Sequence, residues 1–370
     1  MKRKNNPMGE LVCFGGILLL SLFMSKAFLS EGLRDKAIRI AMLSSASSSP
    51  AILKEIDIKN GFWGKEPEKI LVNYKPQELN AVDRLKEKET KRAKKEIPRE
   101  FRGDIIEESF SPIAVGGKSP LIFGNAVINN LTDMSNEDVL SVLKRPWGEN
   151  LGLKDGQDEP VVLIYHTHAT ESFEELDSEI YDKRGTWRSR DNSKNITSVG
   201  DEICKELDRA GIPYIHDKTH HDYPSYNQSY DRSKETVETY LKKYPSIKIA
   251  IDVHRDAVCR GESIVKPVAN IDGEKTAQLM ICIGCDGKDN SVPSWESNLR
   301  LGAELQKRLS AEYESLARPL LLLYRKYNQD LTNGSMLVEI GSHGNTLEEA
   351  KKSGRLFGRC LAQMLLDFEE

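Results

Sequence analysis

Short apolar runs alternate with amphipathic helical segments from residue 160 to the end of the chain, and this alternation limits the possible folds most strongly. The apolar runs are continuous, which is typical of strands that are buried on both faces. Strands and helices that follow each other in this way form a mostly parallel sheet covered by helices. We predict strands at residues 160–164, 214–215, 247–253, 277–283 and 335–340, and helices at residues 199–210, 233–243, 295–313 and 346–367.

The composition excludes two classes of protein. Of the 370 residues, 39% are hydrophobic and 30% are charged, and the net charge of −4 argues against a nucleic-acid-binding protein. The six cysteines are scattered along the chain, which excludes a small domain held by a dense disulfide framework. Cys282 and Cys285 form a CxxC pair, but no second pair completes a metal site. We interpret this pair as part of a buried strand.

The N-terminus combines a basic flank with an apolar run. Met-Lys-Arg-Lys is followed by an apolar run from Leu11 to Met24, which extends to Leu29 if the Lys26 side chain snorkels. Such a segment directs export or membrane insertion. Because Ser-Lys-Ala at residues 25–27 is a poor cleavage site, we favour an uncleaved single-pass anchor over a signal peptide. The positive flank stays in the cytoplasm, which places the rest of the chain outside it.

These features divide the chain into three parts. Residues 1–29 form a cytoplasmic tip and a transmembrane anchor. Residues 30–155 form a charged linker or membrane-proximal region, in which residues 84–102 are dense in Lys, Arg and Glu. The sequence Asp-Gly-Gln-Asp-Glu-Pro at residues 155–160 marks a boundary. We expect the catalytic domain to span residues 156–370, a usual length for one domain.

Polar side chains lie where three of the predicted strands end. His168 and Glu171 follow the first strand, His254 follows the third, and Glu339 lies near the end of the last. Because the ends of parallel strands share one edge of a sheet, these side chains should converge. Two imidazoles and a carboxylate suit a catalytic zinc ion, which keeps a fourth position for water. We therefore predict His168, Glu171 and His254 as zinc ligands, with Glu339 as general base or transition-state stabiliser.

Three further histidines keep more than one interpretation. His166 is an alternative ligand or a donor behind the ligands, and His343 either supports the ligands or faces the substrate. His221 lies in a loop, where it binds metal, anchors the loop or contacts substrate. We interpret His216 as structural. Residues 325–329 carry Arg, Tyr, Asn and Gln side chains that could contact a polar substrate.

Four stretches of the sequence resemble one protein family. In chain order they are VLIYHTHATESF, HDYPSYNQSYDRS, IAIDVHRDA and RKYNQDLTNGSMLVEIGSHGNTLEEA. They are similar to stage II sporulation protein P of endospore-forming bacteria, and the resemblance covers residues 160–368. This family is similar to the zinc-dependent N-acetylmuramoyl-L-alanine amidases. The resemblance implies a mixed, mostly parallel twisted sheet flanked by helices on both faces, zinc bound by His168 and His254, and catalysis by Glu339.

The third zinc ligand remains a choice between two residues. In the amidases a Glu precedes the first helix, whereas the comparable residues 190–195 of this chain offer only Asp191. Glu171 is the competitor, because it follows His168 by three residues, a spacing that also resembles zinc carboxypeptidases. We expect Glu171 to be the ligand and keep Asp191 as the alternative.

The resemblance also implies a substrate, partners and a location. The substrate would be peptidoglycan, cut between the N-acetylmuramoyl lactyl group and L-alanine, with peptide cross-links as a further target. The partners would be the sporulation proteins D and M, at the septum during engulfment. Two alternatives stay open: a zinc endopeptidase that cuts cross-links only, and an inactive septal scaffold or glycan-binding module. The intact His168, His254 and Glu339 argue against the scaffold.

Overall fold

The structure is a computed structural model, and it describes residues 97–111, 119–149, 151–153, 158–285 and 291–369. All of these residues belong to one compact unit. The predicted anchor at residues 1–29 lies outside the described residues. Within the described ranges, none of the helices has the length and apolar character needed to cross a membrane.

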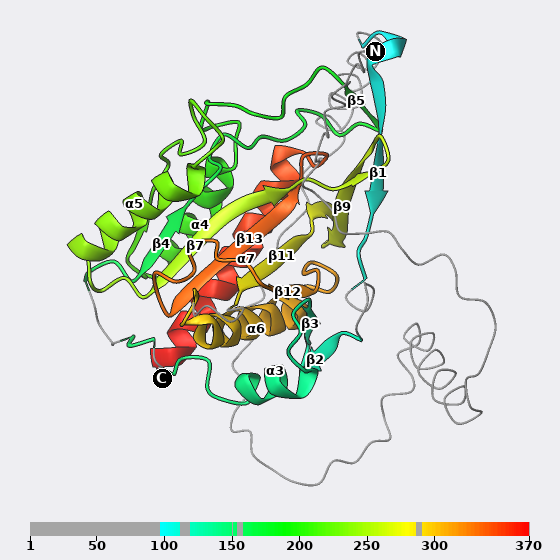
Figure 1. The fold of residues 1–370 in the computed structure, drawn as a ribbon. Coiled ribbons are helices and arrows are strands. Elements are labelled where there is room, and N and C mark those ends of the chain that lie inside the picture. Colours follow the sequence, from blue (N-terminus) through cyan, green and yellow to red (C-terminus); the bar gives the residue numbers. More distant parts are fainter. Residues whose placement is uncertain (1–96, 112–118, 150, 154–157, 286–290, 370) are drawn as a thin grey trace, which may run out of the picture. The chain divides into compact units, whose positions relative to one another are not determined.

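A mixed sheet lies at the centre of the fold, and eight strands of the described residues form it (Figure 1). Neighbouring strands are parallel except in the β2–β3 and β11–β13 pairs, so the predicted mostly parallel sheet is confirmed. Across the sheet the order is β2 (Leu121–Phe123), β3 (Ala126–Asn130), β12 (Leu320–Leu323), β11 (Leu279–Gly284), β13 (Gly334–Ser342), β7 (Ile249–Asp256), β4 (Val162–Tyr165) and β6 (Tyr214–His216).

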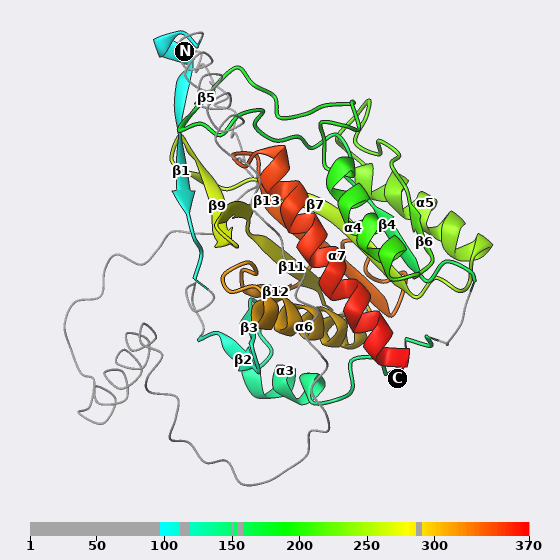
Figure 2. The same ribbon diagram turned by 180° about the vertical axis from the view of Figure 1, so that it is seen from behind.

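Helices cover both faces of this sheet. One face carries α4 (Thr197–Arg209), α6 (Trp295–Glu312) and α7 (Leu347–Glu369), and Figure 2 shows α7 in front of the strands. The other face carries α5 (Ser229–Lys243). A further helix, α3 (Asn136–Leu143), packs beside α6 and β2. The arrangement agrees with the predicted α/β class.

The sequence of β4 explains this layering. Successive side chains of a strand point to opposite faces of the sheet. Val162 and Ile164 therefore enter the large core cluster that also contains apolar side chains of α4 and α7. Leu163 and Tyr165 enter a second cluster with Val237 of α5. A continuous apolar run is needed here because both faces of the strand are buried.

The predicted elements between residue 160 and the C-terminus are all present. Their ends shift by a few residues: α5 begins at Ser229 and β7 extends to Asp256. The CxxC pair lies in and directly after β11, and the side chains of Cys282 and Cys285 are both buried. The interpretation of this pair as part of a buried strand is confirmed.

A second, smaller sheet differs from the sequence prediction. Its strands, as far as the structure describes them, are β10 (Glu274–Ala277), β9 (Ser263–Ile271), β1 (Arg102–Glu108) and β5 (Ile180–Asp182) in this order, with β8 (Cys259–Arg260) paired to β9. Lys266 of β9 has a fully buried side chain and lies 2.7 Å from Glu349 of α7. An ion pair thus connects this sheet to the helix that covers the main sheet.

The folded part of the chain begins before the predicted boundary at residue 156. A short 3-10 helix, η1 (Arg99–Phe101), leads into β1 of the second sheet, and β2 and β3 belong to the main sheet. These elements lie within residues 30–155, where the sequence predicts a charged linker or membrane-proximal region, and they correct the linker prediction for residues 102–111 and 119–149. Among their partners, β1 pairs with β9 and β3 with β12, and both of these partners lie far away in the sequence. A local pattern does not reveal such partners.

Candidate active site

The candidate site lies at the carboxyl ends of β4, β7 and β13, which are neighbouring parallel strands. His168 lies in the turn after β4, and Glu171 follows it. His254 lies in β7, where the register pairs it with Glu339 of β13. The sheet therefore brings the four side chains to one edge, as the strand-end argument predicts.

Two imidazole rings and one carboxylate form the centre of the site. The rings of His168 and His254 are perpendicular, with centroids 5.2 Å apart. Glu171 Oε2 lies 3.8 Å from His254 Nδ1. None of the three residues is more than 6% exposed. Burial, and then the nearby His254, lowers the pKa of His168 to about 4. The His168 ring is therefore neutral, which is the form that binds metals.

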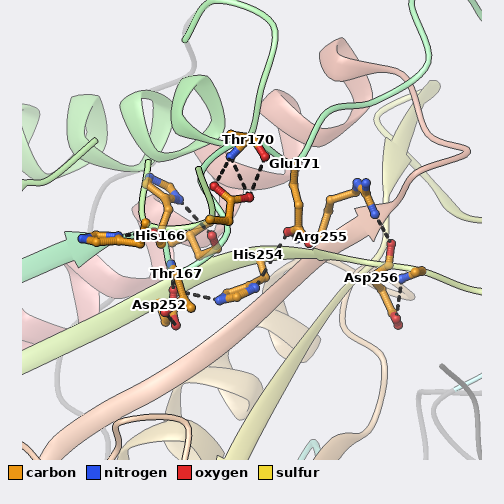
Figure 3. Close-up of polar contacts among 12 residues, drawn as sticks. His166, Thr167, Thr170, Glu171, Asp252, His254, Arg255 and Asp256 are labelled. Carbon is orange, nitrogen blue, oxygen red and sulfur yellow. Dashed lines mark hydrogen bonds and ion pairs between the residues drawn. The ribbon is translucent and has the colours of Figure 1, made fainter. Parts of the chain in front are cut away.

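Asp252 holds the His254 ring in position (Figure 3). Its Oδ1 lies 2.8 Å from His254 Nε2, which leaves Nδ1 on the side of Glu171. Asp252 also accepts hydrogen bonds from the backbone N and the Oγ1 of Thr167, at 2.8 and 2.7 Å. Burial would lower the pKa of His254, but attraction to Asp252 outweighs it and raises the pKa to about 9, so a metal ion bound at this ring would displace a proton. One carboxylate thus links the turn that carries His168 to the strand that carries His254.

Two arginines fix the carboxylate of Glu171. Arg188 Nη2 lies 3.6 Å from Oε1, and the backbone N–H of Arg255 donates to Oε2 at 3.1 Å. Arg188 also contacts Asp222 at 2.7 Å, and the Asp222 carboxylate accepts hydrogen bonds from Thr170. These charge-assisted contacts hold Glu171 in one orientation toward His254.

Glu339 lies beside these groups with its Oε2 atom buried and without a hydrogen-bond partner. Burial, followed by repulsion from Asp256, raises the pKa of Glu339 to about 8, although His254 and Arg318 act in the opposite direction. Asp256 itself pairs with Arg318 at 3.0 Å. A carboxyl group whose pKa lies near neutral pH can both accept and release a proton.

Asp191, the alternative third ligand, lies apart from this centre. Its side chain is exposed, and its Oδ1 accepts hydrogen bonds from the backbone N and the Oγ of Ser193. These bonds stabilise a local turn. Of the two candidates, Glu171 is the one that the structure places beside His254. Its role as a metal ligand stays a prediction.

Three of the other histidines make contacts within the fold. His166 Nδ1 donates to the carbonyl oxygen of Val253, and its Nε2 lies 2.9 Å from His216 Nε2. His221 Nδ1 donates to the carbonyl oxygen of His166, and its Nε2 contacts the hydroxyl of Thr236. These contacts occupy both nitrogens of His166 and His221, which favours anchoring over metal binding.

His343 lies at the rim of the site. Its ring packs edge-on against Trp187, with centroids 5.1 Å apart, and its Nε2 lies 3.9 Å from Cys259 Sγ. Burial, and then the charge of Arg255, lowers the pKa of His343 to about 4. Its Nδ1 is buried without a hydrogen-bond partner. The position is consistent with either predicted role, support of the ligands or contact with substrate.

Four residues of the site were missed by the sequence analysis. Asp252 lies two residues before the strand-end histidine, so both side chains share one face of β7, and this spacing is a usable signal. Tyr226 stacks on His168 with centroids 4.4 Å apart, and Tyr230 meets the same ring edge-on at 5.6 Å. Tyr226 and Arg188 lie in loops, and Tyr230 at the start of α5. No local pattern of the sequence brings such residues to the site.

The chemistry of the donor set fits zinc. Within the described parts of the chain, no group of three or more His, Cys, Asp or Glu side chains is arranged closely enough to hold a metal ion. The buried Nδ1 of His168 nevertheless has no hydrogen-bond partner, and buried polar atoms normally have one. A second imidazole and the Glu171 carboxylate lie beside it. The zinc site remains a prediction with suitable donors.

The fold and the site define an α/β protein with two histidines and two carboxylates at one edge of its main sheet. The sequence model of the family described as Stage II sporulation protein P (SpoIIP) matches residues 64–362. The chain belongs to this family.

A curated relative carries the same description. Stage II sporulation protein P of Bacillus subtilis (strain 168) is 29% identical over 226 residues, which cover 58% of this chain and 53% of the relative. The match thus spans about half of the length of this relative.

Several solved structures are also similar to the chain. The N-acetylmuramoyl-L-alanine amidase AmiC2 of Nostoc punctiforme is 12% identical, with a TM-score of 0.34 over 58% of this chain and 98% of that one. The amidase Ami1 of Mycobacterium abscessus is 12% identical, with a TM-score of 0.35 over 57% and 99%. The CwlD amidase of Clostridioides difficile, solved with the GerS lipoprotein, is 12% identical, with a TM-score of 0.33 over 56% and 99%.

Proposed function

We propose that the chain is a peptidoglycan hydrolase of sporulation, a zinc-dependent N-acetylmuramoyl-L-alanine amidase. The observation that carries the proposal is the register of β7 and β13, which pairs Glu339 with His254. His168 and Glu171 approach the same imidazole from the turn after β4. A carboxyl group able to exchange protons therefore lies beside a set of metal donors, which is the arrangement that metal-assisted hydrolysis requires.

In this proposal His168, Glu171 and His254 would hold a zinc ion. When bound, zinc would supply an acidified water molecule and polarise the amide carbonyl. Glu339 accepts the proton of the attacking water and delivers it to the leaving amine. Its raised pKa makes the ionised carboxylate a stronger base than that of an ordinary glutamate.

The groups behind the ligands determine their orientation. Asp252 engages His254 Nε2 and so presents Nδ1 to the metal position. Arg188 and the backbone of Arg255 hold Glu171. Metal sites commonly depend on such supporting contacts for affinity and for the choice of tautomer.

The family and the sequence also suggest where in the cell the chain acts. The chain would be attached to the membrane by residues 1–29, with its catalytic domain outside the cytoplasm at the sporulation septum. It would act there with the sporulation proteins D and M. The basic flank and apolar run at the N-terminus support the membrane attachment.

Digestion of purified peptidoglycan by the full chain tests this function. The reaction is run with zinc and with a chelator, and mass spectrometry identifies the released ends. Stem peptides that begin with L-alanine, released only without chelator, are the expected result. Cut cross-links alone would favour the endopeptidase. No release in any condition, even with zinc and protein D added, would leave the scaffold or glycan-binding module.

A further inference from the structure

Two loops beside the candidate site place two arginine–tyrosine pairs side by side. The guanidinium carbon of Arg188 lies 5.3 Å from the centroid of the Tyr226 ring. The guanidinium carbon of Arg190 lies 4.5 Å from the centroid of the Tyr223 ring. Residues 188–190 of one loop therefore run alongside residues 223–226 of the other.

Both tyrosines are largely exposed, at 50% for Tyr223 and 59% for Tyr226. Tyr226 also stacks on His168, with ring planes only 11° apart. The exposed aromatic surface is thus continuous with the candidate metal centre. Large aromatic side chains left exposed next to a site of polar residues are characteristic of ligand-binding surfaces.

The exposure does not result from a loosely held loop. Arg232 Nε donates to the carbonyl oxygen of His221, and its Nη2 donates to those of Ser225 and Asn227. Asp222, between these anchors, pairs with Arg188. The two tyrosines are therefore presented to solvent by a fixed backbone, which reduces the entropic cost of binding a ligand.

The two arginines differ in whether a carboxylate of the protein pairs with the guanidinium group. Arg188 is engaged by Asp222 and Glu171. Arg190 is exposed, and among the described residues its guanidinium contacts the Tyr223 ring and no carboxylate. A guanidinium stacked on an aromatic ring is oriented and keeps its N–H donors free for a planar anion.

We propose that Arg190, Tyr223 and Tyr226 form a subsite for the stem peptide of peptidoglycan. Arg190 binds a free carboxylate of the peptide, and the tyrosine rings pack against its aliphatic parts. This inference rests on the proposed function and specifies which part of the substrate lies on this side of His168. A neutral glycan strand would fit the rings but would leave Arg190 without a partner.

Binding measurements with the full chain test the subsite. The Glu339→Gln background prevents cleavage, and the probes are a muramoyl tripeptide with free carboxylates, the same tripeptide with carboxamides, and a peptide-free glycan. Arg190→Gln should weaken binding of the carboxylate probe roughly five-fold, as for an exposed ion pair, and leave the carboxamide probe unchanged. Arg184→Gln is the matched control, because Arg184 packs over Phe101 at 4.6 Å and should affect neither probe.

The outcomes separate this proposal from the function on which it rests. An Arg190→Gln effect on both peptide probes alike, on neither probe, or on the peptide-free glycan would overturn the subsite. The expected binding pattern, together with no release from peptidoglycan by the unmutated chain, would support the subsite while contradicting the amidase.

Discussion

At the scale of single residues, the environment of Glu339 differs from that of an ordinary surface carboxylate. Its Oε2 has no hydrogen-bond partner, and its pKa is raised to about 8. Such a carboxyl group costs stability, because burial disfavours its charged form. Because Glu339 pairs with His254 in the register of the sheet, it lies where a proton acceptor is needed in the proposed mechanism.

Glu339→Gln should retain zinc and lose turnover. The change removes the proton acceptor but keeps the shape of the side chain, so we expect turnover to fall roughly 100- to 10,000-fold. Zinc content and peptidoglycan digestion are measured on the same sample. Glu348→Gln, at an exposed position of α7, is the control and should keep both. Normal turnover in Glu339→Gln would remove this residue from the mechanism.

Asp252→Asn should weaken zinc binding. The amide no longer attracts a proton to His254 Nε2, so the orientation and basicity of the ring change, and affinity should fall about 10- to 100-fold. Competition with a chelating dye measures the dissociation constant. Asp201→Asn removes another carboxylate paired with an imidazole, that of His216, and should leave zinc affinity unchanged. Equal effects of both changes would contradict a special role for Asp252.

The sequence predicts the strand-end residues of this site better than its loop residues. His168, His254 and Glu339 could be brought together by argument because strand order and direction place strand ends at one edge. Arg188 and Tyr226 could not, because their positions depend on contacts between separate segments, such as those of Asp222 with Arg188 and of Arg232 in α5 with His221. The metal and catalytic roles themselves stay predictions.

At the scale of elements, α4 and α7 approach so closely that only glycine fits at two positions of α7. A Cβ atom at Gly358 would lie 2.8 Å from both the Cα and the carbonyl oxygen of Ile203, and one at Gly354 would lie 2.9 Å from the carbonyl oxygen of Val199. The obstacle is backbone, which cannot move aside as a side chain can. The layer that covers one face of the main sheet therefore depends on these glycines.

Gly358→Ala should destabilise the protein although alanine favours helices. The propensity gain of about 1 kcal/mol is opposed by overpacking against the α4 backbone, so we expect the free energy of unfolding to fall by about 1–3 kcal/mol. Urea denaturation measures it. Gln363→Ala, exposed on the same helix, should change stability little. A stabilised Gly358→Ala variant would show that the helices can separate without cost.

Predictability also varies among the elements. The long amphipathic helices and the apolar strands could be predicted because their own periodicity carries the signal. The second sheet could not, because β1 lies near a charged stretch and β9 contains Lys266 and Pro267. β1 and β9 form strands through their pairing with each other, which the sequence of neither segment reveals. Because β1 precedes residue 156, the same pairing makes the folded part begin before the predicted boundary.

At the scale of the whole molecule, a buried lysine connects the second sheet to α7, which covers the main sheet. Lys266 lies 2.6 Å from Asp177 and 2.7 Å from Glu349, and Glu107 and Lys275 extend the network. Burial would lower the pKa of Lys266, but Glu349 and Asp177 outweigh it and raise the pKa. Burial would raise the pKa of Asp177, but Lys266 outweighs it and lowers the pKa.

The contribution of this network should depend on pH. The pKa values of Asp177 and Glu107 are lower in the folded protein than in the unfolded chain. Their ionised forms therefore stabilise the fold at any pH above the ordinary carboxyl pKa, and this stability is lost as the pH falls through the lowered pKa values. The pKa of Lys266 is higher in the folded protein than in the unfolded chain. The charged lysine therefore stabilises the fold fully at any pH below the ordinary lysine pKa, and this stability is lost as the pH rises through the raised pKa. The network should therefore stabilise most between about pH 5 and pH 10.

Lys266→Met should lower the free energy of unfolding by about 3 kcal/mol at pH 7, because it leaves the buried Glu349 carboxylate without its cation. The difference from the unmutated chain should shrink in acid, where the carboxylates are protonated. Urea denaturation at a series of pH values measures this. Lys275→Met is the matched control, because Lys275 is half exposed and should cost less than about 1 kcal/mol. A loss that is independent of pH would indicate packing rather than charge.

The central claim is that His168, Glu171 and His254 converge on one zinc ion beside Glu339. Anomalous diffraction at the zinc absorption edge, from crystals of the chain grown with zinc, tests it most directly. The account predicts one strong peak about 2.0–2.2 Å from a ring nitrogen of each histidine and from a carboxylate oxygen of Glu171. A peak at Asp191 or between His166 and His216, or no peak at this edge of the sheet, would contradict it.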